Sequence, residues 1–199
     1  MIFINWESVN ICDIPDTEYE RIYSLLSPSR KARVDALMHS EDKMCTLAGE
    51  FLARKILKEK YGAESVEITV SDNGKPILNC PLCLSISHSH GTVACAVDTA
   101  PVGIDVEKIR PVKSKLIDRV CTDDELQYVL NGKNPDTLCK NSEVLKRFFE
   151  IWCSKEAYYK KLGGDIKSFK DVNTLTLQKQ IIETPIVYIQ GYFDNYTNE

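Results

Sequence analysis

Two carboxylates stand close together in a short apolar segment, residues 102–108. The alternation of this segment predicts a strand, in which Asp105 and Glu107 point to one face and the apolar residues between them point to the core. Carboxylates about 5 Å apart repel each other by roughly 3 kcal/mol at an effective dielectric constant near 20. A divalent cation such as Mg²⁺ relieves such repulsion and takes oxygen ligands. The alternative is an exposed strand face neutralised by Lys108 or Arg110.

A third carboxylate interrupts an aromatic stripe in the most strongly helical segment, residues 142–162. Glu156 follows Trp152 by one helical turn and shares its face with Tyr159. A carboxylate in such apolar company needs a cation or a proton. Lys160 lies one further turn along the helix, so a simple intrahelical ion pair is the alternative to a catalytic role.

Hydroxyl groups and imidazoles gather in residues 84–91, which end in a glycine. A strand end of this composition suits a phosphate group, and a polar strand-to-turn segment without a ligand is the alternative. A turn at residues 73–76 adds Lys75. Strand alternation divides the polar side chains of the segment between two faces, Ser85, Ser87 and Ser89 on one and His88 and His90 on the other.

Segments of helical period are interspersed with segments of period two, which predicts an α+β fold with mostly antiparallel strands. A joint at residues 98–101 predicts two small halves of similar texture, residues 1–100 and 101–199. We expect helices near residues 28–38, 47–61, 114–130 and 142–162, and strands near 66–70, 82–86, 93–97, 102–106, 175–177 and 186–192.

Composition narrows the class of protein. The chain has 199 residues, 43% of them hydrophobic, and a formal net charge of −4. These values predict a globular protein with a real core and argue against a general nucleic-acid binder. The sequence shows neither a signal peptide nor an apolar stretch suited to a membrane, so we expect a cytoplasmic protein without a membrane partner.

The eight cysteines predict reduced thiols rather than disulfides, because a chain of this length without a secretion signal needs no covalent framework. The spacing of Cys80 and Cys83, with His88 and His90 nearby, leaves a zinc-binding module without catalysis as one alternative function. A second alternative is another Mg²⁺-dependent phosphotransferase or nucleotide hydrolase that uses the same carboxylates.

Four motifs follow one another along the chain: Gly-Lys-Pro at 74–76, Ser-Ile-Ser-His-Ser at 85–89, Gly-Ile-Asp-Val-Glu at 103–107 and Trp-x-x-Lys-Glu-Ala-x-x-Lys at 152–160. In this order and at this spacing they resemble the Sfp-type 4′-phosphopantetheinyl transferases, in the branch with a Lys-Glu-Ala helix motif. The resemblance covers residues 27–160. It implies two similar α+β halves in a pseudo-twofold arrangement, with the active site at their interface.

The resemblance also implies a reaction. Members of the family move 4′-phosphopantetheine from coenzyme A to a serine of an apo acyl, peptidyl or aryl carrier protein. The reaction uses Mg²⁺ and releases adenosine 3′,5′-bisphosphate. Carrier proteins are typically acidic around their serine, and basic residues outnumber acidic ones from Lys140 to Lys170, which makes this stretch a candidate docking face. A solvated helix surface is the alternative, and we expect a monomer.

Matching positions carry the family's roles onto this sequence. The resemblance implies that Asp105, Glu107 and Glu156 hold Mg²⁺ against the pyrophosphate. Lys160 then faces the pyrophosphate or the incoming serine, and either Glu156 or a metal-ordered water takes the serine proton. Glu125 matches an acid that some relatives use in this deprotonation. Coenzyme A is expected to contact six residues of the first half, Arg30, Arg33, Thr46, Lys75, Ser87 and His88.

The sequence departs from the family pattern at Cys45, where several relatives carry an arginine for the 3′-phosphate end of the nucleotide. Lys43 is the candidate substitute for that arginine. The departure concerns the affinity for the nucleotide and leaves the expected chemistry unchanged.

Overall fold

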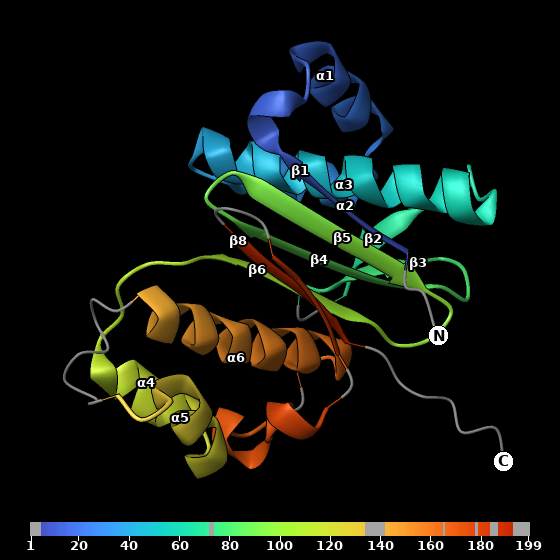
Figure 1. Cartoon of the computed structure of the whole chain (residues 1–199). Coiled ribbons are helices and arrows are strands. Elements are labelled where there is room, and N and C mark those ends of the chain that lie inside the picture. Colours follow the sequence, from blue (N-terminus) through green and yellow to red (C-terminus); the bar gives the residue numbers. More distant parts are fainter. Residues whose placement is uncertain are drawn as a thin grey trace, which may run out of the picture.

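The structure is a computed structural model, and it describes residues 5–71, 74–133, 142–164, 166–177, 179–183 and 187–192. Helices pack on antiparallel sheets in four layers, a helix, two facing sheets and a second helix, as Figure 1 shows. This arrangement confirms the predicted α+β class. The predictions for Asn73, Cys139, Lys140, Asp165 and Ile186 concern positions outside the described residues.

The first sheet consists of β1 (Asn5–Asn10), β5 (Thr92–Asp98) and β4 (Cys83–Ser89), with β5 in the centre and antiparallel to both neighbours. The long helix α3 (Ser40–Tyr61) covers one face and ends at Gly62, which adopts the left-handed conformation that glycine tolerates best. Leu52 and Ile56 are among its fully buried residues. The smaller elements of this half are η1 (Ile11–Asp13), α1 (Asp16–Leu25), α2 (Pro28–Ala36), β2 (Ile68–Val70) and β3 (Pro76–Leu78).

The second sheet has the strand order β6-β8-β7 and is also antiparallel. The helix α6 packs against its strands β6 and β8, on the side away from the first sheet (Figure 1). The elements of this half are β6 (Gly103–Lys108), α4 (Ser114–Val120), α5 (Asp123–Leu130), α6 (Ser142–Lys161), η3 (Phe169–Asp171), η4 (Thr174–Thr176), β7 (Lys179–Glu183) and β8 (Val187–Tyr192).

Gly103 determines how closely α6 approaches β6. A Cβ atom at this position would lie 1.8 Å from the carbonyl oxygen of Ala157 and 2.9 Å from the backbone nitrogen of Lys161. Any larger residue would therefore push the helix away from the strand. This contact explains why a glycine opens the strand motif.

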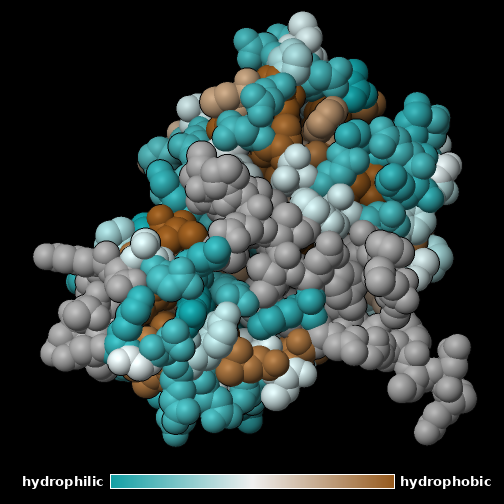
Figure 2. All heavy atoms as spheres, in the orientation of Figure 1, coloured by the Kyte–Doolittle hydropathy of each residue, from teal (hydrophilic) through white to brown (hydrophobic). Residues whose placement is uncertain are grey.

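The two sheets meet through small and branched apolar side chains. Ala94 and Ala96 of β5 pack with Ile104 and Val106 of β6, and all four are fully buried. A separate apolar cluster lies between the first sheet and α3, and another surrounds α6, α4 and α5. Figure 2 shows a largely hydrophilic surface in this view, with hydrophobic atoms visible mainly where α1 packs on α3.

Several elements differ from the sequence predictions for identifiable reasons. The predicted helix at 114–130 is two helices, because Thr122 caps a new one by accepting a hydrogen bond from the backbone nitrogen of Glu125. The predicted strand at 175–177 is wrong, since this region is the 3₁₀ helix η4. Strands β1, β3 and β7 and helix α1 were not predicted.

Every helix in the described part of the chain is too short or too polar to cross a bilayer. Seven cysteines fall within the described residues, and all seven are free thiols.

Candidate active site

The carboxylate of Asp105 lies at the junction of the two halves. Its Oδ1 atom accepts hydrogen bonds from Ser87 Oγ of β4 at 2.7 Å and from Lys160 Nζ of α6 at 2.6 Å. The side chain is only 5% exposed, and its Oδ2 atom is buried without a hydrogen-bond partner. A buried carboxylate oxygen without a partner costs free energy in the isolated protein, which is typical of an atom that awaits a ligand.

Lys160 joins the strand motif to the helix motif. Besides the salt bridge to Asp105, its Nζ donates to Ser87 Oγ at 2.8 Å. The sequence left open an intrahelical ion pair of Lys160 with Glu156, but the structure directs the ammonium group across to β6. The lysine therefore bridges a residue of each half.

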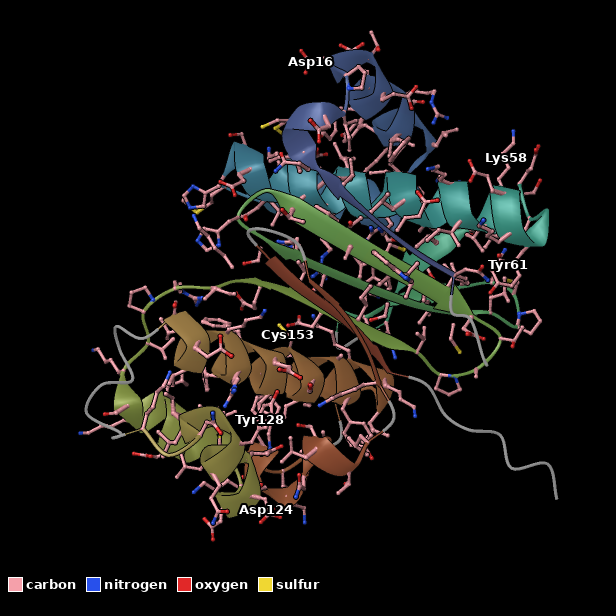
Figure 3. All side chains as sticks on the ribbon, in the orientation of Figure 1. Asp16, Lys58, Tyr61, Asp124, Tyr128 and Cys153 are labelled. Carbon is pink, nitrogen blue, oxygen red and sulfur yellow. The ribbon has the colours of Figure 1, made fainter. Side chains whose placement is uncertain are left out.

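Glu156 is half-buried beside this bridge. Burial, and then the negative charge of Asp105, raises the pKa of Glu156; Glu107 adds to the effect and Lys160 opposes it. The thiol of Cys153 lies on the same side of α6, which faces β6 in Figure 3. Burial raises its pKa first, followed by the charge of Asp105 and a side-chain hydrogen bond to that carboxylate. The carboxylates of Asp105, Glu107 and Glu156 thus lie close together, beside the ammonium group of Lys160.

The described residues contain no group of three or more His, Cys, Asp or Glu side chains arranged to hold a metal ion by themselves. A structural zinc site needs four protein ligands, so the zinc alternative on Cys80 and Cys83 finds no support. Magnesium differs, because it commonly takes one or two carboxylates and completes its shell with substrate phosphates. The buried Asp105 oxygen without a hydrogen-bond partner fits that requirement, and Glu107 and Glu156 lie near it as further oxygen donors.

The turn of the Gly-Lys-Pro motif reaches the end of α6. Lys75 Nζ donates to the carbonyl oxygen of Lys160 at 3.1 Å. The guanidinium group of Arg33 packs on Gly74, whose φ of +82° suits a glycine. A cavity of about 270 Å³ opens between this turn, β4 and the end of α6, with Tyr159 among the residues that line it.

His88 and Thr46 lie on the side of the first half that α3 covers. The His88 side chain is exposed, yet surrounding groups desolvate it enough to lower its pKa, and the charges of Asp42 and Lys160 act on it in opposite directions. Thr46 Oγ1 donates to the backbone oxygen of Asp42 at 2.9 Å. The start of α3 and the end of α6 therefore both lie within electrostatic range of His88.

Sequence similarity to known proteins identifies the family of this chain. The sequence model described as the 4′-phosphopantetheinyl transferase superfamily matches residues 101–197. Over 186 residues the chain is 30% identical to 4′-phosphopantetheinyl transferase Sfp of Bacillus subtilis (strain 168), which covers 90% of this chain and 80% of that protein. The chain belongs to the 4′-phosphopantetheinyl transferase family.

Two further sequence relatives agree with this assignment. The transferase is 32% identical over 153 residues to psf-1 of Bacillus pumilus, covering 75% of this chain and 63% of the relative. It is 31% identical over 170 residues to HetI of Nostoc sp., and the match covers 80% of this chain and 69% of the relative. A crystal structure of a holo-(acyl-carrier-protein) synthase from Bacillus anthracis in complex with CoA (3′,5′-ADP) aligns at 21% identity and a TM-score of 0.38, covering 47% of this chain and 91% of that one. The predicted family is confirmed, and the chain is an enzyme of this class.

Two of the residues predicted to act in the transferase, Arg30 and Glu125, form buried salt bridges with residues outside the carboxylate cluster. Arg30 is buried and forms a salt bridge at 3.2 Å with Glu50, which also pairs with Arg54. Its Nε atom is buried without a hydrogen-bond partner. A single sequence does not reveal this pairing, because the buried glutamate lies on another helix.

Glu125 is the second such residue. Both its oxygens are occupied: Oε2 binds the backbone nitrogen of Thr122 and Nζ of Lys155, and Oε1 binds the backbone nitrogen and the hydroxyl of Thr174. Burial alone would raise the pKa of Glu125, but these bonds outweigh it and lower the pKa. The threonine three residues earlier was a sequence signal for a helix cap. The partner Lys155 was not singled out from the sequence.

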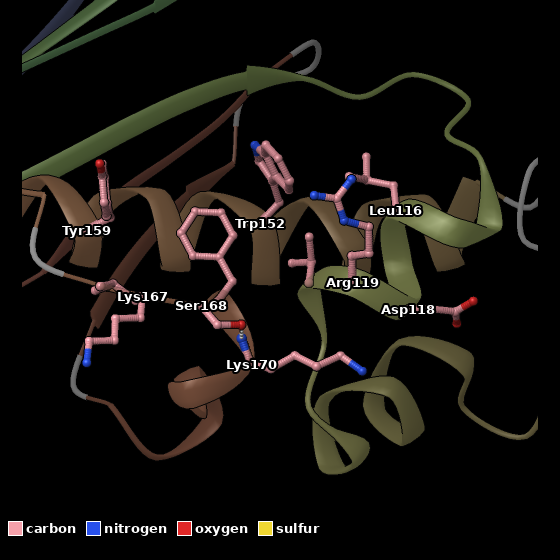
Figure 4. Close-up of a pocket in the computed structure, with 11 residues that line it drawn as sticks. Leu116, Asp118, Arg119, Trp152, Tyr159, Lys167, Ser168 and Lys170 are labelled. Carbon is pink, nitrogen blue, oxygen red and sulfur yellow. Dashed lines mark hydrogen bonds between the residues drawn. The ribbon is translucent and has the colours of Figure 1, made fainter.

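A groove of about 610 Å³ lies beside α6 on the second half of the transferase. Figure 4 shows Trp152 and Tyr159 of α6 on one side, with Arg119 reaching toward Trp152 from α4. Lys167 and Lys170 belong to the loop that closes the groove, and both are exposed. The aromatic stripe of α6 thus reaches a groove with basic side chains at its edge.

Proposed function

We propose that the junction of Asp105, Glu107, Glu156 and Lys160 is the site where the transferase moves 4′-phosphopantetheine from coenzyme A to a serine of an apo carrier protein. The observation that carries the proposal is the buried, unpartnered Oδ2 of Asp105 within this group of carboxylates. Family membership supplies the reaction. The site lies where the two halves of the chain meet, which suits a reaction between two large substrates.

The chemistry is one substitution at phosphorus. The carrier serine oxygen attacks the β-phosphorus of coenzyme A, forms a new phosphate ester, and displaces adenosine 3′,5′-bisphosphate. Little covalent work falls to the protein, so positioning and charge neutralisation dominate. Mg²⁺ held by Asp105, Glu107 and Glu156 would neutralise the pyrophosphate.

Glu156 is the candidate acceptor for the serine proton. In the metal-free protein, burial and the charge of Asp105 raise the pKa of Glu156, and a bound cation would lower it again, so a metal-ordered water is the alternative acceptor. Lys160 is the candidate partner for the pyrophosphate, and its contacts with Asp105 and Ser87 hold its ammonium group at the junction. The contacts of Glu125 favour a structural role for that residue over a part in deprotonation.

We assign the nucleotide of coenzyme A to the first half, residues 1–100. Lys75, Ser87 and His88 support this assignment because they lie at or near Lys160. Arg33 packs on the same turn as Lys75. Thr46 remains a predicted contact, as does Arg30, which would have to exchange its partner Glu50 for a phosphate.

We assign the carrier protein to the second half, residues 101–199. The groove beside α6 supports the assignment, because it combines aromatic side chains with the basic residues Arg119, Lys167 and Lys170. Such a surface suits an acidic helical partner. The monomeric state and the cytoplasmic location stay predictions.

The test is the intact mass of an apo carrier protein after incubation with this chain, coenzyme A and Mg²⁺. A gain of one phosphopantetheine that a chelator prevents is the expected result. A carrier whose acceptor serine is replaced by alanine is the control, and it should gain nothing. Release of the bisphosphate without any carrier would instead indicate a nucleotide hydrolase. No gain across an acyl, a peptidyl and an aryl carrier would contradict the proposal.

A further inference from the structure

Three serines of β4 bridge the two sheets. The backbone nitrogens of Ile104, Val106 and Lys108 in β6 donate to the hydroxyl oxygens of Ser85, Ser87 and Ser89, respectively, at 3.1, 3.4 and 3.4 Å. Both sets advance by two residues, so the strands run parallel although they belong to different sheets. Side-chain oxygens thus replace the backbone carbonyls that a neighbouring strand would supply.

Each serine hydroxyl that accepts a bond still has one proton to donate. Ser87 donates to Asp105 Oδ1 at 2.7 Å, and Ser89 donates to Glu107 Oε2 at 3.1 Å. The third residue in this series is Gly103, which has no carboxylate to receive a proton. Ser85 therefore shares the bridge to β6 without a carboxylate partner on the neighbouring residue.

The contacts around Ser89 fix the direction of its proton. His90 Nδ1 lies 3.1 Å from Ser89 Oγ, and because the serine proton goes to Glu107, the imidazole must donate from Nδ1. His90 begins the turn between β4 and β5 with a φ of +48°. The Ser89 oxygen thus accepts hydrogen bonds from the Lys108 backbone nitrogen and from His90 Nδ1, while the Ser89 hydroxyl donates to Glu107.

The second contact of Glu107 completes the orientation. Arg110 donates to the same Oε2 atom at 3.4 Å, and Glu107 is only 22% exposed. Both of these bonds fall on Oε2, so the other oxygen stays available for a ligand. Ligating carboxylates are commonly oriented in this way by hydrogen bonds from residues behind them.

We propose that Ser89 is a positioning residue that orients Glu107 for a divalent cation and couples this carboxylate to the junction of the halves. The inference rests on the proposed function, because the cation is the one that the transfer reaction would use. Ser89 touches neither substrate nor the reacting atoms in this arrangement. Its effect should therefore appear in the affinity for the cation before it appears in the maximal rate.

The experiment compares Ser89→Ala with Ser85→Ala in the full chain. Each variant loses one acceptor for a β6 backbone nitrogen, and Ser85→Ala should lose the more thermal stability because its bond is buried whereas that of Ser89 is exposed. Only Ser89→Ala loses a donor to a carboxylate. We measure the Mg²⁺ concentration for half-maximal transfer, and the affinity for Mn²⁺ in the presence of coenzyme A by electron paramagnetic resonance. Ser89→Ala should weaken both by about tenfold, and Ser85→Ala by less than about twofold.

Ser89→Thr keeps a hydroxyl in a side chain that strands favour, and it should restore the wild-type affinity for both cations. Equal shifts in the two alanine variants, or no shift in Ser89→Ala, would overturn the inference. If Ser89→Ala does not fold, Ser89→Cys replaces it, because a thiol is a similar size but a weak donor, and an unchanged affinity then overturns the inference too. Wild-type protein without Mg²⁺-dependent transfer would overturn the proposed function itself.

Discussion

Helix α6 provides the lysines of two lysine–carboxylate pairs. The N–O distances of the two pairs are similar, but the pairs differ in burial and in their other hydrogen bonds. Lys155 Nζ lies 2.7 Å from Glu125 Oε2, and Lys160 Nζ lies 2.6 Å from Asp105 Oδ1. Both side chains of the first pair are completely buried, whereas 29% of the Lys160 side chain is exposed. The two pairs stand little more than one helical turn apart, so the difference arises from their surroundings.

In the first pair, every hydrogen-bonding atom of the two charged groups has a partner, and we call this pair closed. Lys155 uses all three of its donors, because Nζ also binds the carbonyl oxygens of Phe169 and Val172 at 2.6 Å each. Glu125 is equally saturated by Thr122 and Thr174. This network ties α5 and the segment from η3 to η4 onto α6, so the pair organises the second half and leaves no atom for a substrate.

In the second pair, one carboxylate oxygen has no hydrogen-bond partner, and we call this pair open. Asp105 keeps one oxygen without a hydrogen-bond partner, and the pKa of the neighbouring Glu156 is raised by burial and by the nearby carboxylates. Lys160 binds a serine of the other half as well as the aspartate. Saturation of the hydrogen-bonding atoms, and not burial or charge pairing alone, distinguishes the structural pair from the pair that we propose to be functional.

The largest effect should come from breaking the closed pair. Lys155→Met leaves the charge of Glu125 buried and removes the donor from two carbonyl groups. We expect the free energy of unfolding to fall by about 3–5 kcal/mol, as measured by urea denaturation. Lys115→Met, at an exposed lysine of α4, is the control and should stay within about 0.5 kcal/mol of wild type. A loss below about 1 kcal/mol for Lys155→Met would contradict the closed-pair interpretation.

Breaking the open pair should spare the fold and remove the activity. Asp105→Asn loses the charge that holds Lys160 and an oxygen suited to the cation. Single-turnover transfer should slow by on the order of 10²–10³-fold, about 3–4 kcal/mol, with thermal stability at or above that of wild type. Asp13→Asn, at an exposed position of η1, should transfer at the wild-type rate. Transfer by Asp105→Asn within tenfold of wild type would remove Asp105 from the site.

The pH dependence of stability should have opposite signs at the two sites. The folded-state pKa of Glu125 is lowered below 4.5, so its contribution is present above that pH and is lost as the pH falls through the folded pKa. The pKa of Glu156 is raised above 4.5, so stability is complete below that pH and declines as the pH rises through the folded pKa.

Substitution by glutamine makes this difference measurable. In protein treated with a chelator, Glu156→Gln should raise the free energy of unfolding at about pH 7 by about 1 kcal/mol, the usual size of a stabilising substitution at a functional site. Glu125→Gln should lower the free energy and flatten its decline toward acid pH. Thermal unfolding between about pH 2.5 and pH 8 gives both curves, because the Glu125 contribution changes below pH 4.5 and that of Glu156 changes above it. Shifts of the same sign would disprove the distinction between the pairs.

The smallest effect concerns the groove that the closed pair supports. Lys155 binds the backbone on either side of Lys170, which lines this groove. Lys170→Glu should lower kcat/KM for an acidic carrier protein by about threefold at low salt, and by less at high salt, with unchanged thermal stability. Lys115→Glu is the matched control on α4. An effect of Lys170→Glu that does not depend on salt would argue against electrostatic docking.

Local signals in the sequence predicted much of the site. The period of residues 102–108 predicted that Asp105 and Glu107 share one face of a strand. The period of residues 142–162 predicted the helix that carries Glu156 and Lys160, whose start and end agree with the structure to within a residue. These features depend on neighbours within one turn or one strand, which a single sequence displays directly.

Other contacts of the site residues could not be predicted, because their partner residues lie far away in the sequence. Glu50 captures Arg30 from a different helix, and Thr174 saturates Glu125 across 49 residues. The serines of β4 were interpreted as a phosphate site because alternation gives a face but not the strand opposite it. Nothing in residues 84–91 indicates that β6 lies beside them.

By itself, the sequence determined which residue types the site contains and how each is spaced along its own strand or helix, because periodicity is a local property. Only the tertiary structure decided which charged atoms are saturated. The closed state of Glu125 and the open state of Asp105 depend on donors that α5, α6, β4 and η4 bring together. Saturation of the hydrogen-bonding atoms is a property of the assembled fold, and it distinguishes the lysine–carboxylate pair that stabilises the second half from the pair that we propose for the chemistry.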